Sequence, residues 1–578
     1  MKEEEDWTLQ TVSENQNTVT LTDLRPDTEY NIKCAAVGKL DYTVESDVTK
    51  VITKNKNDLI EKSILIKDGN PARYRLQTKT DQSDNMDESE PYRKMSFGER
   101  DKNKPHKIIL MVGETGTGKT TLINAMINYM LGVKREDKVW FEITDDQSEQ
   151  TSAHRQTSIT TVYGFYVQES QTDLTIIDTP GYGDTCGVDL DKEIAESLLS
   201  LSESAEEINE THAVCLVIKA TQNQLSDTEI HLFDAVQSLF GRDTAENIVL
   251  LFTYSDGARP KNVLTAVKEA KVKCAVNNKS KPVFFLFNNC QSETDDEDEE
   301  DDDEDHEQRL DQSWNRSFRG MAGLFKFLES IKPKSLMMTR DVFKQRRQLE
   351  ANISNLQSRV HMTELKQNEL KQTQAALEKN KKDVEENKNF EYEVEVPYKE
   401  KVDIDYSVAS VATCCSVCEE NCHYPGCSWV RDLSLCDVMN ANHCTVCTKK
   451  CHHSKHVKAA KIYETKTKKE KRTHEELKKK YDGEIGDCVS VVQKLEEELQ
   501  ELEKEKIKLI NKAFHCVETL EKIALNTDSL LTLLHIDVLI EKLKEINEPV
   551  KAEILENIKK RAREEKQKAL GFIARFHK

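Results

Sequence analysis

The most informative segment of this sequence is Gly113-Glu-Thr-Gly116-Thr-Gly118-Lys119-Thr120, which lies between an apolar run and a helix-forming stretch. A G-x-x-x-x-G-K-[ST] pattern in that position is typical of a phosphate-binding loop, because backbone N–H groups and the helix N-terminus surround the phosphates. Lys119 is expected to reach the β- and γ-phosphate oxygens, and Thr120 to bind Mg2+. The predicted phosphate site comprises Gly113, Glu114, Thr115, Gly116, Thr117, Gly118, Lys119, Thr120 and Thr121.

Six apolar runs alternate with helix-forming stretches around this loop. They are Lys107 to Val112, Thr161 to Val167, Asp173 to Asp178, Ala213 to Ile218, Asn247 to Thr253 and Val283 to Asn288. A short polar turn joins the second and third runs, which permits an antiparallel hairpin, whereas a parallel connection needs a dozen or more residues. The sequence therefore predicts an α/β domain over residues 105–334, with a mostly parallel sheet and helices on both faces.

A second motif, Asp178-Thr-Pro-Gly181, closes the third apolar run. An Asp at a strand end can hold Mg2+ through water, while the N–H of Gly181 meets the γ-phosphate. From the Thr-rich segment 157–161, Thr160 is expected to close on Mg2+ and the γ-phosphate when a triphosphate is bound. The alternative is that Thr160 is an ordinary β-forming residue at the start of a strand.

Four segments carry a resemblance to a known family. They are Asp178-Thr-Pro-Gly-Tyr-Gly-Asp184, Leu239-Phe-Gly241, Ile248-Val-Leu-Leu-Phe-Thr253-Tyr-Ser-Asp256 and Phe287-Asn-Asn289. In these motifs the sequence resembles the GTPases of immunity-associated proteins, which are relatives of septins and of the chloroplast import GTPases. The resemblance implies a P-loop G domain that binds GTP, acts as a switch and associates with itself in a nucleotide-dependent way.

The same resemblance assigns the residues that read the base. The family's guanine-reading Asp falls on Asp256, and Asn288 and Asn289 would lie at the opposite edge of the base. An ordinary G protein has Asn-Lys-x-Asp where this chain has Thr253-Tyr-Ser-Asp256, which weakens the base clamp and keeps ATP as an alternative nucleotide. GTP is favoured because adenine cannot supply the charge-assisted pair with Asp256.

The segment after the Asp-x-x-Gly motif predicts slow hydrolysis. In Ras-type proteins a Gln soon after this motif orients the attacking water, whereas here Tyr182 follows Gly181 and residues 182–187 contain no Gln. The missing group is expected from a second G domain that the coiled coils bring close. Arg155 is the candidate for a charge-stabilising finger, and the alternative is a solvated loop arginine. The predicted catalytic set is Lys119, Thr160, Gly181 and Arg155.

Appendages are predicted on both sides of this domain. Leu24-Arg-Pro-Asp-Thr-Glu-Tyr30 looks like the tyrosine corner of a fibronectin type III sandwich, of which too few strands are present. The run 293–307 contains 13 acidic residues and predicts a disordered loop over 292–308. The expected order is a partial fibronectin type III-like sheet (1–54), a linker (55–104), the G domain (105–334), a coiled coil (335–391), a Cys/His-rich segment (392–465) and a coiled coil with a basic helical C-terminus (466–578). This layout is also similar to that of large fish proteins.

Two heptad patterns flank the Cys/His-rich segment. The first begins with Leu349, Ile353, Leu356 and Val360. The second keeps a strict 4-3 alternation with one Lys over Cys488, Val492, Leu495, Leu499, Leu502, Lys506, Leu509, Ala513, Cys516, Leu520 and Ile523. Such spacing favours coiled coils over generic surface helices, and we expect them to contribute to self-association.

The Cys/His-rich segment contains a duplication. Cys415, Cys418, Cys422, His423 and Cys427 recur 29 residues later as Cys444, Cys447, Cys451, His452 and His456. Each copy offers enough thiolate and imidazole ligands for one closed tetrahedral Zn2+ site. Cys414, Cys436 and His453 are spare, which leaves the partition of the ligands open, and the spacing does not fit a RING finger. We predict structural zinc at the turn of a helical hairpin, with disulfides or idle cysteines as the alternative.

The composition of the chain limits the partners and the localisation that we expect for it. No stretch approaches the ~18 apolar residues of a membrane span, and Met1 to Asp6 lacks the apolar core of a signal peptide. We therefore expect a cytoplasmic protein without a nucleic-acid partner. The basic end, Lys559 to Lys578, is expected to be a solvated helix end, and the alternative is a contact with acidic lipid. The expected function is Mg2+-dependent GTP binding with slow, assembly-stimulated hydrolysis. The alternatives are a zinc-stapled coiled-coil scaffold with a structural nucleotide, and an ATPase.

Overall fold

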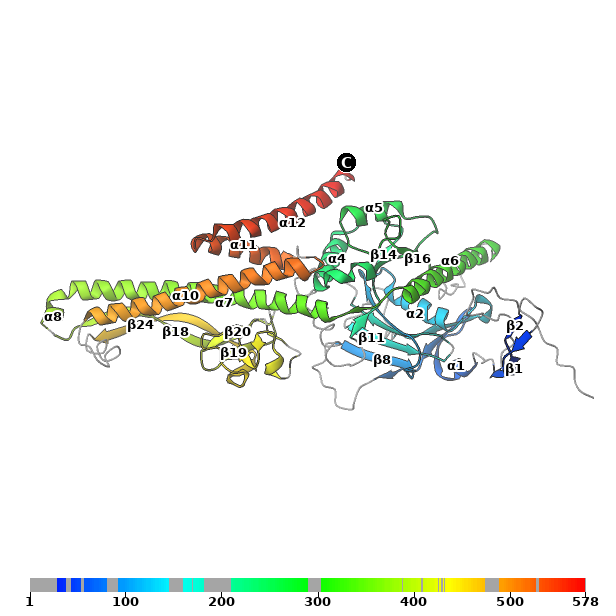
Figure 1. Ribbon diagram of the computed structural model, residues 1–578, viewed down its shortest axis with the longest axis horizontal. Helices are drawn as coiled ribbons and strands as arrows, with labels where there is room; N and C mark the ends of the chain where they lie inside the picture. Colours follow the sequence, from blue (N-terminus) through cyan, green and yellow to red (C-terminus); the bar gives the residue numbers. More distant parts are fainter. Residues whose placement is uncertain are drawn as a thin grey trace, which may run out of the picture.

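The computed structural model shows small N-terminal strands, a central α/β domain and a long arm of helices and strands (Figure 1). It describes residues 29–37, 43–52, 57–80, 92–144, 160–168, 170–180, 209–289, 303–386, 388–406, 409–424, 426–427, 430, 432–473, 488–526 and 530–576. No helix among these residues is long and apolar enough to cross a membrane.

The central domain is built on an eight-stranded sheet with the order β16-β15-β14-β9-β12-β11-β8-β7. The strands are β7 (Lys79–Thr80), β8 (Tyr92–Gly98), β9 (His106–Val112), β11 (Thr160–Tyr166), β12 (Asp173–Asp178), β14 (Ala213–Lys219), β15 (Ile248–Thr253) and β16 (Phe284–Leu286). β11 and β12 form the predicted antiparallel hairpin, whereas β9, β12, β14, β15 and β16 run parallel. The predicted mostly parallel sheet is therefore confirmed.

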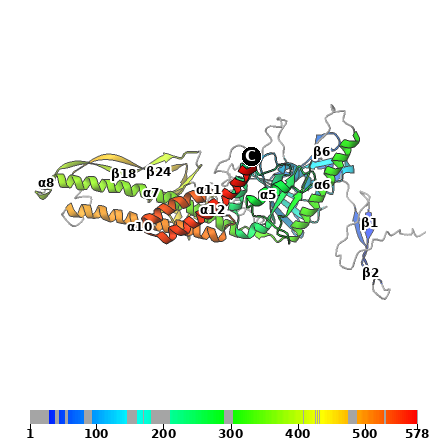
Figure 2. The same ribbon diagram turned by 90° about the horizontal axis from the view of Figure 1, so that it is seen from above.

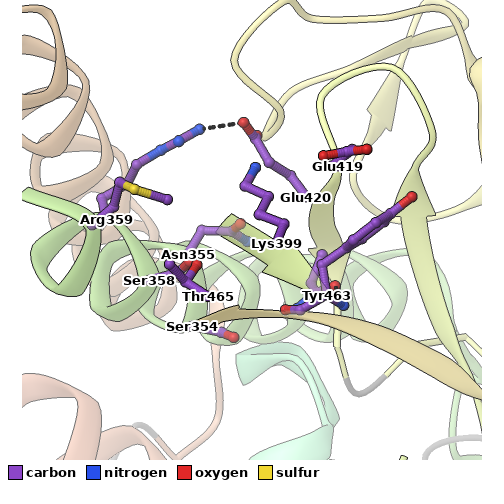
Figure 3. A pocket seen from close by; sticks show the side chains of 11 residues that line it. Ser354, Asn355, Ser358, Arg359, Lys399, Glu419, Glu420, Tyr463 and Thr465 are labelled. Carbon is purple, nitrogen blue, oxygen red and sulfur yellow. Dashed lines mark hydrogen bonds and ion pairs between the residues drawn. The ribbon is translucent and has the colours of Figure 1, made fainter. Parts of the chain in front are cut away.

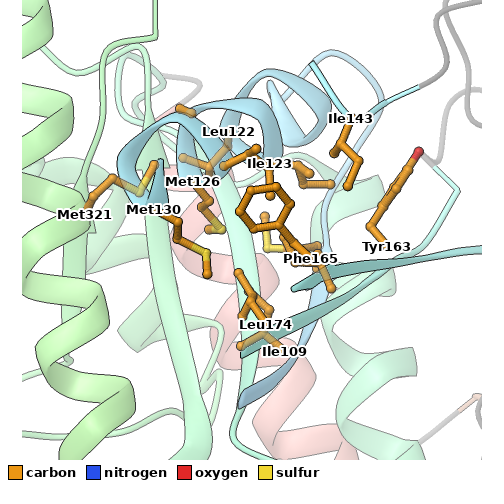
Figure 4. Close-up of a cluster of buried hydrophobic side chains, with 14 of the residues drawn as sticks. Ile109, Leu122, Ile123, Met126, Met130, Ile143, Tyr163, Phe165, Leu174 and Met321 are labelled. Atoms are coloured by element: carbon orange, nitrogen blue, oxygen red, sulfur yellow. The ribbon is translucent and has the colours of Figure 1, made fainter. Parts of the chain in front are cut away.

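Helices cover both faces of this sheet. They are α2 (Lys119–Met130) and α6 (Asp303–Ser330) on one face, and α4 (Asp227–Leu239) and α5 (Lys261–Glu269) on the other. On the first face, Met126 and Met321 pack against Ile109 and Phe165 of the sheet (Figure 4). Each such fully buried side chain contributes ~1.5–3 kcal/mol relative to an exposed one. This core fixes the strand ends from which the candidate site is built.

Much of the segment 55–104, expected to be a linker, is folded. It contains α1 (Asn57–Glu61), β5 (Ser63–Lys67) and β6 (Ala72–Leu76), together with β7 and β8 of the main sheet. β5 and β6 form a second sheet with β10 (Val139–Glu142), and Leu76, Met95 and Phe97 lie in the core. The prediction was wrong because these strands bury only part of their side chains, so their composition looks polar.

Part of the acidic run, which was expected to be a disordered loop, is helical. Residues 303–308 belong to α6 and are not part of a disordered loop over 292–308. The other residues of that range, 292–302, lie outside the described residues. In the N-terminal region, β1 (Glu29–Ile32) pairs with β4 (Thr49–Ile52), and β2 (Ala35–Val37) pairs with β3 (Thr43–Glu45). The fibronectin type III assignment stays a prediction.

The arm follows the central domain. Its elements are α7 (Met337–Lys379), α8 (Lys381–Glu385), β18 (Glu391–Asp403), β24 (Lys461–Thr473), α10 (Cys488–Ile523), α11 (Leu530–Glu545) and α12 (Pro549–Phe576). The hairpin of β18 and β24 runs back along α7 (Figure 2). The Cys/His-rich segment therefore lies beside α7, not at the turn of a helical hairpin as expected. Residues 466–473, expected in the second coiled coil, belong to β24.

The two heptad patterns pack on each other within the chain. Leu349, Ile353 and Leu356 of α7 share one buried cluster with Leu509 and Ala513 of α10. Residues of α11 and α12 complete the same cluster, including Leu539 and Leu555. These parts of the two seams are therefore covered inside one chain, and association between chains through the coiled coils stays a prediction.

The arm is attached where α4 ends. The backbone N–H of Leu525 donates to the carbonyl of Phe240 at 2.9 Å. Arg346 of α7 donates from Nε to the carbonyl of Ser238 at 3.0 Å and from Nη2 to the carbonyl of Asn526 at 2.8 Å. A Cβ on Gly241 would lie 2.6 Å from Met338, so α7 approaches this turn closely. Both long helices of the arm are therefore fastened to the same turn.

Candidate functional site

The phosphate-binding loop requires its glycines. A Cβ on Gly113 would lie 2.6 Å from the carbonyl oxygen of Val217, a distance that real contacts do not reach. Gly116 and Gly118 have φ angles of 75° and 81°, in the left-handed region that favours glycine. Gly118 is also the residue that precedes α2. The glycine spacing thus lets the loop turn directly into the helix N-terminus, where an anion is favoured.

Lys119 and Asp178 are both buried below this loop and influence each other electrostatically. Lys119 is 7% exposed, and its Nζ donates to the carbonyl of Gly113 at 2.6 Å and to that of Glu114 at 3.2 Å. Burial lowers the pKa of Lys119. Burial raises the pKa of Asp178 to about 7, with the Lys119 ammonium acting in the opposite direction. Oδ1 of Asp178 is buried without a hydrogen-bond partner, and a divalent cation beside it would favour the ionised carboxylate.

The other predicted phosphate and Mg2+ residues lie around this pair. Thr120 and Thr121 are half-buried in the first turn of α2. Thr160 is the buried first residue of β11, and its neighbour Thr161 pairs with Asp178 across the hairpin. The strand register therefore brings the end of the Thr-rich segment to the Asp178 end of β12. Gly181 and Arg155 lie outside the described residues, so their roles stay predictions.

The predicted base-reading loop is tied to the phosphate loop. Oγ1 of Thr253 donates to the carbonyl of Thr117 at 2.6 Å. Tyr254 has a φ of 50°, and its ring would be 3.6 Å from a Cβ on Gly118. Asp256 is exposed, and its Oδ1 accepts from the backbone N–H of Ala258 at 2.7 Å. This leaves Oδ2 of Asp256 available to a base.

Helix α6 supports both base loops with residues that the sequence analysis missed. Nη1 of Arg316 donates to the carbonyl of Ser255 at 2.7 Å. Ser317 Oγ accepts from the N–H of Asn288 at 2.9 Å and lies 2.8 Å from Oδ1 of Asn289. Ser313 also bonds to the carbonyl of Asn288. No motif marks these side chains, and the neighbouring acidic run conceals the start of their helix.

A further missed contact joins the phosphate loop to α4. Oγ of Ser226 donates to Oε1 of Glu114 at 2.8 Å. Ser226 caps α4 and accepts from the N–H of Glu229, whose carboxylate accepts from the N–H of Ser226 in return. The Ser-x-x-Glu capping box of residues 226–229 is a sequence signal for this helix start. It could have placed Ser226 near the site, because helices of such sheets begin close to the carboxyl ends of strands.

The phosphate loop, the buried Asp at the end of β12 and the β11–β12 hairpin together define a P-loop G domain. Residues 107–306 match the AIG1 family. Among solved structures, this chain aligns with Toc33 from Arabidopsis thaliana in complex with Mg2+ and GMPPNP, at 13% identity over 40% of this chain and 88% of that chain, with a TM-score of 0.26. A dimerization-deficient mutant of Toc33 aligns at 14% identity over 32% of this chain and 71% of that chain, with a TM-score of 0.23. A comparison with curated proteins gave no match.

The Cys/His-rich segment forms a compact module on the arm, called here the Cys/His module (residues 409–459). Its short strands are β19 (Ala412–Cys415), β20 (Glu420–His423), β21 (Met439–Asn440), β22 (His443–Cys444) and β23 (His456–Ala459). Three groups of side chains have ligand atoms that all lie within 4.8 Å of one another. They are Cys415, Cys418, Cys447 and Cys451; Cys422, Cys444, Cys447 and His456; and His423, Cys427 and Cys436.

These groups differ from a partition in which each sequence copy forms its own site. The first two groups combine residues of both sequence copies, so neither copy forms a closed site alone. Cys436, expected to be spare, belongs to the third group, with its Sγ 3.3 Å from Nδ1 of His423. His452, a predicted ligand, is outside all three groups of the described residues, and its Nδ1 accepts from the N–H of Ser454. Spacing along the chain selected nine of the ten side chains in these groups, but not how they are grouped.

Proposed function

We propose that the AIG1-family domain binds GTP with Mg2+ and hydrolyses it slowly. The observation that carries this proposal is the burial of both Lys119 and Asp178 under the phosphate loop, with Oδ1 of Asp178 lacking a hydrogen-bond partner. Lys119 would neutralise the β- and γ-phosphates, and Asp178 with Thr120 and Thr160 would hold Mg2+. The metal would polarise the phosphate oxygens, while the loop N–H groups and Lys119 position them.

Guanine recognition is part of the same proposal. Asp256 offers Oδ2 on a loop that Arg316 and Thr253 hold from two sides. A carboxylate that accepts from N1–H and the 2-amino group distinguishes guanine from adenine, which lacks both donors. Asn288 and Asn289 are fixed by Ser313 and Ser317 at the next strand end. ATP is the alternative nucleotide that the test below separates.

Assembly-stimulated hydrolysis would come from the G domain itself. Much of the two coiled-coil seams is buried within the chain, which favours a second copy meeting this chain through the AIG1-family domain. The expected result is a specific activity that rises with protein concentration in the presence of GTP. A per-molecule rate that is constant over a hundredfold concentration range would contradict this part of the proposal.

The test of nucleotide identity uses the full chain. Bound nucleotide is extracted and identified, and turnover of GTP and ATP is measured with and without Mg2+. Lys119→Ala should abolish triphosphate binding, whereas Lys279→Ala, which removes the same charge from an exposed loop, should not. Unhydrolysed GTP would favour a scaffold with a structural nucleotide, and ATP turnover would refute the GTPase assignment.

We also propose that the Cys/His module binds Zn2+ as a structural metal. Groups of buried thiols and imidazoles at these separations are the ligand sets that Zn2+ prefers in closed sites. The module would then fold against α7 in its metal-bound form. Purified chain without bound zinc would refute this.

A further inference from the structure

We propose that the thiolate of Cys447 bridges two zinc ions, so that the Cys/His module contains a two-metal cluster. This inference rests on the proposal that the module binds zinc, and it concerns how the metal is held. Cys447 is the one residue that the first two ligand groups share, among the described residues. Two tetrahedral ions need eight ligand positions, and the two groups supply seven side chains. A shared thiolate provides the eighth position.

The distances suit tetrahedral coordination. Zn–S bonds of about 2.3 Å place two sulfur ligands of one ion ~3.8 Å apart. Sγ of Cys418 lies 3.8 Å from Sγ of Cys451, and these residues come from different sequence copies. The other ligand atoms of each group lie within 4.8 Å of one another. The module therefore brings the thiols to metal-binding distance by crossing its two copies.

His456 points independently to a bound cation. It is 5% exposed, and its Nδ1 lies 3.1 Å from the carbonyl oxygen of His452. A donor at Nδ1 leaves Nε2 with a lone pair, and Nε2 is buried without a hydrogen-bond partner. Metal-bound histidines typically hold their second nitrogen by such a bond to a carbonyl, which fixes the ring and its tautomer. A zinc ion would satisfy the otherwise orphaned nitrogen.

Backbone N–H groups surround the sulfur atoms. The N–H groups of Val446 and Cys447 each donate to Sγ of Cys444 at 3.3 Å. The N–H of Cys451 donates to Sγ of Cys447 at 3.2 Å, and that of Cys418 donates to Sγ of Cys415 at 3.4 Å. Donors directed at sulfur favour the thiolate, which is the form that binds metal. Sγ of Cys447, the proposed bridging atom, is therefore one of the sulfur atoms that accept such a hydrogen bond.

The charge of such a cluster also fits its surroundings. Six thiolates and two Zn2+ ions have a net charge of −2. Lys399 donates to the carbonyl of Cys418 at 2.8 Å, and Lys512 of α10 donates to that of Thr445 at 2.7 Å. Figure 3 shows Lys399 beside Arg359 of α7, which pairs with Glu420 at 2.8 Å. Lys399 and Lys512 therefore lie close to the excess negative charge, whereas the charge of Arg359 is offset by Glu420 and Glu505.

The third group is a separate site. His423, Cys427 and Cys436 share no ligand with the cluster and are buried. Arg347 of α7 lies 3.4 Å from both Sγ of Cys427 and Oδ2 of Asp437. With three protein ligands this group would hold a single ion without a thiolate bridge. It serves as an internal reference for the cluster.

Cadmium-113 NMR of the full chain reconstituted with 113Cd2+ tests the bridge. Two resonances should show mutual scalar coupling through the shared sulfur, one with four sulfur ligands and one with three sulfur ligands and a nitrogen. The third site should give an uncoupled resonance. Uncoupled signals from all sites would overturn the bridge while leaving zinc binding intact. A purified chain without zinc, which also fails to take up 113Cd2+, would refute both proposals.

Metal counting in variants gives a second, independent readout. Cys447→Ala should weaken both cluster ions, so that about two zinc ions per chain are lost on mild chelation. Cys415→Ala removes a ligand of one ion and should cause the loss of about one. Cys427→Ala should release only the ion of the third site. Equal losses for Cys447→Ala and Cys415→Ala would contradict a shared thiolate. If a variant does not fold, the cadmium spectrum of the unmodified chain still decides.

Discussion

Replacing Asp256 by Asn tests the assignment of the base-reading loop with the exchange of one atom. Oδ1 of Asp256 accepts from the N–H of Ala258 at 2.7 Å, and Asn keeps this oxygen, so the turn is preserved. The amide nitrogen then replaces the oxygen that is available to guanine. Because N1–H and the 2-amino group are also donors, the variant would place donors against donors.

The magnitude follows from the hydrogen bond that is lost. A hydrogen bond to a charged group contributes ~1.5–3 kcal/mol, and each ~1.4 kcal/mol changes affinity tenfold. Asp256 is exposed, so the lower end of this range applies and GTP should bind about 10- to 30-fold more weakly. Xanthosine triphosphate has an oxygen in place of the 2-amino group and should bind more tightly to the variant than to the unmodified chain.

Displacement of a fluorescent nucleotide measures all three affinities. Asp341→Asn makes the same charge change on the exposed surface of α7 and should leave GTP affinity unchanged. ATP affinity should be unaffected in both variants. Equal GTP affinity in Asp256→Asn and the unmodified chain would refute the assignment. An equal fall for GTP and ATP would show that the loop had been disturbed.

Three further predictions follow from buried contacts outside the reacting groups. Arg316→Ala removes the support of the Ser255 carbonyl and should cost ~1–3 kcal/mol, seen as a fall in GTP affinity that exceeds the fall for inorganic triphosphate. Leu356→Ala in the fully buried seam should lower the free energy of unfolding by ~2–5 kcal/mol, whereas Leu534→Ala at an exposed position should change it by less than ~0.5 kcal/mol in urea titrations. Burial lowers the pKa of His212 to about 4, and its Nδ1 accepts a hydrogen bond from β9. The unfolded chain takes up this proton first, so stability should fall as pH decreases from 6.5 to 4, and His212→Asn should show a smaller fall in thermal melts.

The central sheet was predictable because its strands are buried on both faces. Runs such as 213–218 and 247–253 are buried on both faces and therefore lack the alternating polar residues that make a strand resemble a loop in composition. The short turn between β11 and β12 predicted their antiparallel pairing, and the structure confirms it. The glycines of the phosphate loop were equally readable, since a side chain at Gly113 has no space.

Edge elements were not predictable in the same way. β8 contributes Met95 and Phe97 to the core, but charged residues precede Met95 in the same strand. A seven-residue strand with one buried side resembles a polar linker in composition. The support of Asn288 by Ser317 was hidden for another reason. Serine has no signature that separates a buried hydrogen bond from a solvent-exposed position, so only the packing of α6 reveals it.

The candidate metal ligands show what residue spacing alone cannot predict, namely which of them share a site. A repeat of five residues at one offset predicted that these side chains bind metal, and ten candidates were named. Spacing cannot distinguish ligands that pair within a copy from ligands that pair across copies, because both place cysteines at the same intervals. The antiparallel contacts between β19 and β23, which place Cys415 of one copy beside His456 of the other, bring the two copies together. That pairing depends on contacts distant in sequence.

The attachment of α7 and α10 beside the end of α4 has a mechanical consequence. α7 has 43 residues, and at 1.5 Å per residue it extends ~65 Å from the turn at Gly241. A tilt of about 5° at this turn would move the far end of α7 by ~6 Å, by the geometry of a rigid rod of that length. α10 packs alongside α7 and is attached to the same turn. The two helices would therefore move together as one rigid body instead of bending separately. A small rotation at the turn near Gly241 would therefore produce a large displacement at the far end of α7.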